Sequence, residues 1–157
     1  MSERLRRLER VYERHPIYFV TACVVDRRRI LDNPAIHDGF LHFSHAASQH
    51  GAWVGRYVLM PDHIHLFVAL DERLTSLARW MKSLKNSLSK SLRPLGQAAP
   101  HWQKGFFDHV MRGGESYSQK WDYVRENPVR AGLVFRAEDW PYAGEIHELE
   151  YRRDLLL

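Results

Sequence analysis

Residues 57–68 decide the fold and read Tyr57-Val58-Leu59-Met60-Pro61-Asp62-His63-Ile64-His65-Leu66-Phe67-Val68. Two runs of apolar residues with strand propensity lie on either side of a Pro-Asp pair, which is typical of a tight turn. The stretch therefore predicts a β-hairpin. We expect its two strands to cover Ala52–Met60 and His63–Leu70.

Two histidines occur two residues apart in the second of these strands. Side chains at positions i and i+2 of a strand point to the same face, so His63 and His65 should project together while Ile64 points away. Imidazoles are costly to bury without partners. The pair therefore suggests a shared ligand such as a divalent metal ion, although a structural histidine pair would give the same pattern.

Length and composition indicate one globular domain, residues 1–157. Hydrophobic residues make up 45% of the chain and charged residues 27%, as in ordinary soluble proteins. No apolar run approaches the roughly 18–20 residues that cross a bilayer, and the first ten residues lack the apolar core of a secretory signal. The single cysteine, Cys23, is expected to be a buried thiol in a reducing cytoplasm.

Further elements are predicted on both sides of the hairpin. A capping box at Ser116 should begin the last helix, and Pro128 should end it near Asn127. The order β-α-β-β-α-β-α predicts an α+β fold, a ferredoxin-like sandwich of helices on an antiparallel sheet. Residues 1–15 should form a basic arm or helix, and residues 136–157 a tail. The other expected elements are a strand at Ile17–Val25, a helix from Asn33-Pro34 to about His50, a helix at Thr75–Leu92 and a strand at Gly105–Met111.

The last predicted helix has two distinct faces. Tyr117, Trp121 and Val124 form an apolar stripe that should pack on the core. Tyr123 and Asn127 are four residues apart and should share a separate, polar face with Lys120. This polar stripe becomes chemically significant if the helix lies across the two histidines.

Several of these motifs resemble a known family. The His63-Ile64-His65 motif resembles the paired histidines of the HUH single-strand DNA endonucleases, and residues 123–134 resemble the signature of their single-tyrosine transposase branch. Residues 102–109 and 138–142 are similar to the REP-associated tyrosine transposases. The resemblance extends over roughly residues 16 to 144, and several motifs occur in the same order as in the family.

The resemblance implies a metal-dependent single-stranded DNA endonuclease and strand transferase. His63, His65 and Asn127 would hold Mg²⁺ or Mn²⁺; related insertion-sequence transposases carry Gln where this chain has Asn127. Tyr123 would be the nucleophile that forms a 5′-phosphotyrosine intermediate, and Tyr117 is its rival. The implied partners are DNA hairpins of the repetitive palindromic type. The protein would act in the cytoplasm at the nucleoid, as a monomer or a homodimer.

Positive charge is concentrated in two segments that could contact DNA. The formal net charge is +4, which is compatible with a nucleic-acid partner. Lys82, Lys85 and Arg93 should share the polar face of the second helix and follow a phosphate backbone, unless that face is simply solvated. We expect further contacts from Lys120, which could equally be an ordinary surface lysine, and from Arg4 and Arg7 in the basic arm.

Two other functions remain open from the sequence. A domesticated protein could bind DNA hairpins without cutting them, although a pure binder does not need the set His63, His65, Tyr123 and Asn127. A metal-dependent hydrolase of small phosphoesters would turn over without forming a protein–DNA adduct. The basic helix would be hard to explain in such a hydrolase.

Overall fold

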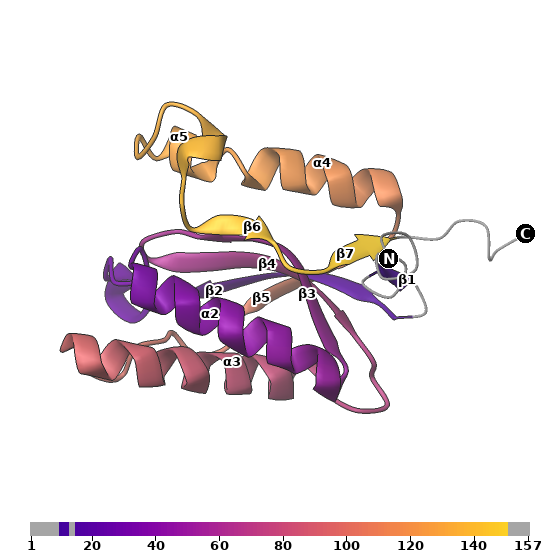
Figure 1. The fold of residues 1–157 in the computed structure, drawn as a ribbon, viewed down its shortest axis with the longest axis horizontal. Helices are drawn as coiled ribbons and strands as arrows, with labels where there is room; N and C mark the ends of the chain where they lie inside the picture. The colour runs from indigo at the N-terminus through magenta and orange to yellow at the C-terminus, as the bar shows by residue number, and fades with distance from the viewer. Residues whose placement is uncertain (1–9, 13–14, 151–157) are drawn as a thin grey trace, which may run out of the picture.

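The computed structural model describes residues 10–12 and 15–150 of the chain. A five-stranded antiparallel sheet, in the order β5-β2-β4-β3-β6, lies between two layers of helices (Figure 1). Helices α2 and α3 cover one face, and α4 and α5 lie over the other. The predicted α+β sandwich is therefore confirmed. The strands of this sheet are β2 (Ile17–Cys23), β3 (Ala52–Leu59), β4 (His63–Leu70), β5 (Phe107–Met111) and β6 (Ala143–Glu145).

The β3–β4 hairpin forms the centre of the sheet, as predicted. Its strands pair with Leu59 opposite Ile64 and Val58 opposite His65. The turn closes when the backbone N–H of Met60 donates to the carbonyl of His63 at 2.8 Å. Met60 therefore belongs to the turn, one residue beyond the end of β3.

The main core lies between the sheet and helices α2 (Pro34–Ala47) and α3 (Leu77–Leu92). Asn33 caps α2 by accepting a hydrogen bond from the N–H of Ala35 at 2.8 Å, and Pro34 occupies the first turn as predicted. Phe40, Leu84 and Leu88 are fully buried in this layer. No helix in the described part of the chain combines the length and the apolarity that crossing a membrane requires.

A second, smaller core lies under helix α4 (Gly114–Val124). Its members include Phe67 of β4 and the stripe of Tyr117, Trp121 and Val124, as predicted from the spacing. The capping-box prediction was wrong: the helix begins at Gly114, with Gly113 at the cap, and Ser116 lies within its first turn.

The end of α4 also differs from the prediction. The helix stops at Val124, and Asn127 begins a separate short helix, α5 (Asn127–Arg130). Pro128 has no backbone N–H to donate to the carbonyl four residues earlier, so the helical hydrogen-bond ladder is interrupted there. Asn127 is therefore not one turn further along the helix that carries Tyr123.

The two ends of the described chain form short strands that the sequence did not predict. Strand β1 (Arg10–Tyr12) pairs in parallel with β7 (Glu148–Glu150), where an arm or helix was expected. Strand β6 pairs with β3 and makes part of the expected tail an edge of the main sheet. Arg4 and Arg7 lie outside the described residues.

Candidate active site

The paired histidines project from β4 toward the α4 side of the sheet. Ile64 points into the opposite core, under α2 and α3, as the strand alternation predicts. His63 pairs with Cys23 and His65 with Thr21 of the neighbouring strand β2. The two imidazole rings approach edge to face, with centroids 4.7 Å apart. The predicted shared face is therefore confirmed.

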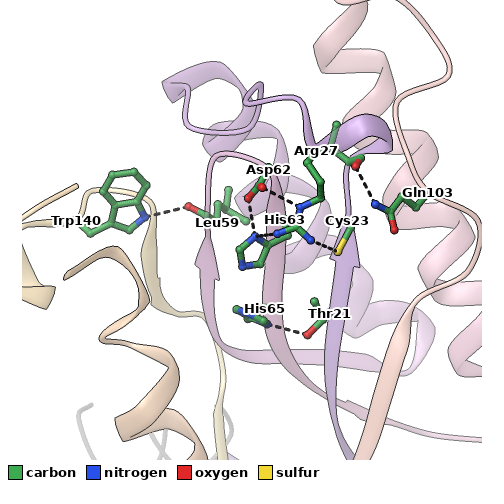
Figure 2. Close-up of polar contacts among 10 residues, drawn as sticks. Thr21, Cys23, Arg27, Leu59, Asp62, His63, His65, Gln103 and Trp140 are labelled. Atoms are coloured by element: carbon green, nitrogen blue, oxygen red, sulfur yellow. Dashed lines mark hydrogen bonds and ion pairs between the residues drawn. The ribbon is translucent and has the colours of Figure 1, made fainter. Parts of the chain in front are cut away.

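Each histidine uses its Nδ1 atom for a contact with the protein (Figure 2). Nδ1 of His63 lies 2.7 Å from a carboxylate oxygen of Asp62, and Nδ1 of His65 lies 2.8 Å from the hydroxyl of Thr21. The tautomer protonated at Nδ1 satisfies both contacts and leaves both Nε2 lone pairs open. Metal-ligating histidines commonly have this kind of outer-shell partner, so the pair fits a divalent metal ion.

A third ligand for such an ion must be a group other than a His, Cys, Asp or Glu side chain. Within residues 10–12 and 15–150, no group of three or more His, Cys, Asp and Glu side chains is placed to hold a metal ion. The remaining positions would have to be filled by an amide oxygen, by water or by a substrate phosphate. All of these are acceptable ligands for Mg²⁺ and Mn²⁺.

Arg27 extends the contacts of His63 to a second element. Its Nε donates to Asp62 at 2.9 Å, and its Nη1 donates to Sγ of Cys23 at 3.4 Å (Figure 2). Burial raises the pKa of Asp62, but hydrogen bonds from His63 and Arg27 outweigh burial and hold that pKa below its usual value. Asp62 is therefore ionised at neutral pH and can fix the orientation of the His63 ring.

His65 is held in its neutral form by its surroundings. Burial lowers the pKa of His65 to about 3, with further lowering by the neighbouring His63 and by the positive charges of Lys120, Arg130 and Arg27. A neutral imidazole can bind a metal ion without first losing a proton. The charges of Lys120 and Arg130 also show that the helical layer lies close to this ring.

Helix α4 lies across the histidine face, as the sequence interpretation required. The Lys120 ammonium lies 4.7 Å from the ring centroid of Phe19, and the Phe19 ring stacks on His65 at 5.4 Å. Tyr123, one turn further on, is 62% exposed. In Figure 1, α4 lies over the sheet, and α5 follows its C-terminal end.

Arg130 links the tyrosine to the predicted third metal ligand. Its guanidinium carbon lies 4.0 Å from the ring centroid of Tyr123, and it donates hydrogen bonds to the Tyr123 carbonyl and to the side-chain oxygen of Asn127. The amide oxygen of Asn127 is therefore engaged by Arg130. Sequence reasoning missed Arg130, although its position three residues after Asn127 was a visible signal.

Tyr117 is buried and unsuited to be the nucleophile. Its ring packs on Phe67 with centroids 4.5 Å apart, and burial raises the pKa of its phenol to about 12. An attacking phenol must reach a phosphate and lose its proton, and this environment hinders both steps. Tyr123 is the accessible alternative on the same helix.

The basic residues of α3 lie on the other side of the sheet from the histidines. Lys82 and Arg93 are exposed there. Lys85 is half-buried, and its ammonium donates to the carbonyls of Gln103 (at 3.1 Å) and Gly105, so it fastens the loop before β5. Burial lowers the pKa of Lys85. The DNA-contact role of Lys82, Lys85, Arg93 and Lys120 stays a prediction.

The matching family and the similar proteins belong to one class of enzyme, the tyrosine transposases, which cut and join DNA strands. The family described as IS200-like transposases matches residues 14–127, most of the chain. The chain therefore belongs to the IS200-like transposase family.

Similar proteins include members of the branch that the sequence motifs resemble. A Haemophilus influenzae protein assigned to the REP-associated tyrosine transposases is 26% identical over 137 residues, which cover 81% of this chain and 78% of that protein. The REP-associated tyrosine transposase of Escherichia coli K12 is 26% identical over 92 residues, which cover 57% of this chain and 52% of that protein.

Solved structures agree with the fold. The structure of a REP-associated tyrosine transposase bound to a REP hairpin superposes with a TM-score of 0.62 at 21% identity, over 85% of this chain and 78% of that one. A Deinococcus radiodurans R1 protein assigned as a transposase gives a TM-score of 0.51 at 18% identity, over 70% of this chain and 88% of that one.

Proposed function

We propose that this protein cleaves single-stranded DNA beside hairpin elements and rejoins it through a covalent bond to Tyr123. The observation that carries the proposal is the position of α4, which brings an exposed tyrosine and Lys120 to the face where His63 and His65 leave their Nε2 atoms open. The bound REP hairpin of the structural neighbour supports a hairpin substrate.

The chemistry is a phosphoryl transfer that conserves the energy of the phosphodiester. The phenolic oxygen of Tyr123 loses its proton to solvent and attacks the scissile phosphorus, so that an O–P bond forms to the enzyme. The bond to the 3′ oxygen breaks, and that oxygen leaves as a free 3′-OH after taking up a proton. A DNA 3′-OH can later attack the 5′-phosphotyrosine and restore the phenol, so neither step needs ATP.

The chain's own residues prepare this step. Lys120 lies one turn before Tyr123 and Arg130 contacts its ring, so both place positive charge where the scissile phosphate would bind. Mg²⁺ or Mn²⁺ would be held by His63 and His65, and by Asn127 once its amide is released from Arg130. When bound, the ion supplies positive charge that polarises the scissile phosphate.

The position of α4 also supports a site that is complete within one chain. The helix that carries Tyr123 covers the histidines of its own sheet, through Lys120 and Phe19. A monomer could then carry out cleavage without a tyrosine from a partner. In a dimer that exchanged these helices, Tyr123 would instead serve the partner's histidines.

Replacement of Tyr123 by Phe tests the proposal. The substrate is an end-labelled hairpin with a single-stranded extension, taken from inverted repeats beside the gene, and Mn²⁺ is added. We expect the wild-type protein to form an adduct that survives denaturing electrophoresis. We expect Tyr123→Phe to form none, because it lacks the attacking oxygen, while DNA binding measured by anisotropy stays within about two-fold of wild type.

Further experiments distinguish this function from hairpin binding without cleavage and from phosphoester hydrolysis. Tyr117→Phe is the matched control and should retain the adduct, and a chelator should abolish it. An adduct that persists in Tyr123→Phe would contradict the assignment of the nucleophile. Wild-type protein that binds the hairpin but never forms an adduct would indicate a hairpin-binding protein, and turnover without an adduct would indicate a hydrolase.

A further inference from the structure

Phe107, at the start of the edge strand β5, is a large aromatic side chain that the core does not use. It is 71% exposed. Its neighbour Phe106 packs against the core under α3, so consecutive rings point to opposite faces. A single exposed apolar side chain is common on protein surfaces and does not by itself indicate a contact site. The neighbours of Phe107 must therefore decide whether its ring binds something.

The sheet register places Phe107 on the histidine face. Phe107 pairs with Thr21, and Thr21 pairs with His65, so the three side chains form one row across β5, β2 and β4. Paired residues of neighbouring strands project to the same face. The Cα atoms of Phe107 and His65 are two strand spacings apart, roughly 10 Å. A single strand of stacked nucleotides spans that distance in about three nucleotides.

A hollow of about 170 Å³ lies beside Phe107, and two of its lining residues, Thr21 and Cys23, also contact residues of the site. Thr21 and Cys23, which contact His65 and Arg27, form one wall, and the loop of residues 103–106 forms another. Lys85 fastens this loop from the α3 side through two backbone carbonyls, so its shape is supported. Lys104 of the same loop is exposed, and its side chain has no hydrogen bond or ion pair with any described residue.

We propose that Phe107 and the hollow beside it bind a base of the single-stranded DNA segment next to the scissile phosphate. The base stacks on the Phe107 ring, and Lys104 neutralises an adjacent phosphate. Aromatic rings bind unstacked bases without strong sequence preference, and a cation nearby strengthens the contact with the backbone. This proposal rests on the proposed function, because it takes His63 and His65 as the place where the strand is cut.

The charge pattern favours DNA over the other occupant, a second copy of this chain. A β5 edge paired with another β5 would bring Lys104 of each copy to the same surface as an exposed Phe107. The nearby cations Lys104 and Lys120 are instead complementary to a polyanion. An acidic strand that carries flat bases matches both the ring and the charges.

Stacking is measured with a hairpin that carries a single-stranded extension and with the same hairpin without the extension. Single 2-aminopurine bases are placed in turn along the extension, and all proteins carry Tyr123→Phe so that no cleavage occurs. We expect fluorescence quenching at one or two positions. Phe107→Ala should abolish the quenching and weaken binding of the extended hairpin roughly ten-fold, as loss of one base–aromatic stack predicts.

Control variants separate stacking from folding. Phe107→Trp should retain the quenching because it keeps a ring, and both Phe107 variants should bind the hairpin without extension as the parent does. Phe135→Ala removes a ring that is 99% exposed in the loop after α5 and does not line the hollow, so it should change nothing. An abasic residue at the quenched position should erase the difference between Phe107→Ala and its parent.

The results that would overturn the stacking site differ from those that would contradict the proposed function. Equal weakening of both DNAs by Phe107→Ala, or no weakening of either, overturns the stacking site even when Tyr123 forms its adduct. Sedimentation that changes from dimer to monomer in Phe107→Ala also overturns it and makes the edge a contact between copies. Parent protein that binds neither DNA contradicts the proposed function itself.

Discussion

At the scale of single residues, the orientation of the two imidazoles depends on neighbours rather than on the histidines themselves. Asp62 and Thr21 hold the Nδ1 atoms, and Arg27 holds Asp62 in turn. An unpartnered ring could rotate or adopt the other tautomer, which would place a proton on Nε2. The contacts made by Asp62, Thr21 and Arg27 therefore decide whether His63 and His65 present open Nε2 atoms to a metal ion.

Removal of the carboxylate that holds His63 should weaken metal binding. We expect Asp62→Ala to lower the affinity for Mn²⁺ about 10- to 100-fold, the usual effect of losing an outer-shell partner. Mn²⁺ titration followed by electron paramagnetic resonance measures this directly and needs no DNA. Asp62→Asn keeps a hydrogen-bond acceptor, so its affinity for Mn²⁺ should fall less than that of Asp62→Ala.

An exposed aspartate of α2, which covers the opposite face of the sheet, provides the control for this change. Asp38→Ala also removes one negative charge and should leave Mn²⁺ affinity unchanged. If Asp62→Ala and Asp38→Ala bind Mn²⁺ equally well, Asp62 does not position His63.

At the scale of elements, the junction between α4 and α5 controls what the helical layer presents to the sheet. Pro128 interrupts the helix, and Arg130 folds back to contact the Tyr123 ring and the Asn127 amide. Arg130 thereby occupies the amide oxygen that sequence reasoning assigned to the metal. The junction holds the Tyr123 ring and the Asn127 amide together through Arg130, even though the two residues belong to different helices.

Loss of the Arg130 guanidinium should therefore tighten metal binding. In Arg130→Met the Asn127 oxygen is released and one positive charge near His65 is removed, and both changes favour a cation. We expect Mn²⁺ affinity to rise a few-fold in the same titration. Arg125→Met removes a charge that pairs with Glu138 at 3.8 Å and should have no such effect. Equal or weaker binding in Arg130→Met would show that Asn127 is not a ligand.

At the scale of the whole molecule, the segment after α5 completes the layer that contains the site. Trp140 is buried in the core under α4, and its indole N–H donates to the carbonyl of Leu59 at 3.0 Å, just before the histidine turn (Figure 2). Strand β6 then pairs with β3 and covers that edge of the sheet. The region expected to be a tail is thus part of the fold.

Truncation of Trp140 should be costly for stability. We expect Trp140→Ala to lower the free energy of unfolding by about 3–5 kcal/mol, because it leaves a cavity and an unpaired carbonyl. Chemical denaturation measures the loss. Phe135→Ala, at a side chain 99% exposed, should stay within about 0.5 kcal/mol of wild type. A similarly small loss for Trp140→Ala would mean that residues 136–150 do not support the core.

The sequence by itself determined the features that follow from local periodicity. Alternation in β4 put His63 and His65 on one face, and helical spacing put Tyr117 and Val124 in the core, away from Tyr123. The hairpin, the class of the sheet and the main helices were predictable for the same reason. Helix ends were less predictable, because caps and breaks depend on single residues such as Gly113 and Pro128.

Only the tertiary structure decided which distant groups meet at the site. Arg27 lies 36 residues before His63 in the chain, and Phe107 reaches the same face only through the pairing of β5 with β2. No local pattern specifies such contacts, because they depend on strand register and on which face each helix covers. The histidines and the tyrosine were visible as motifs, but their placement on facing layers is a property of the folded chain.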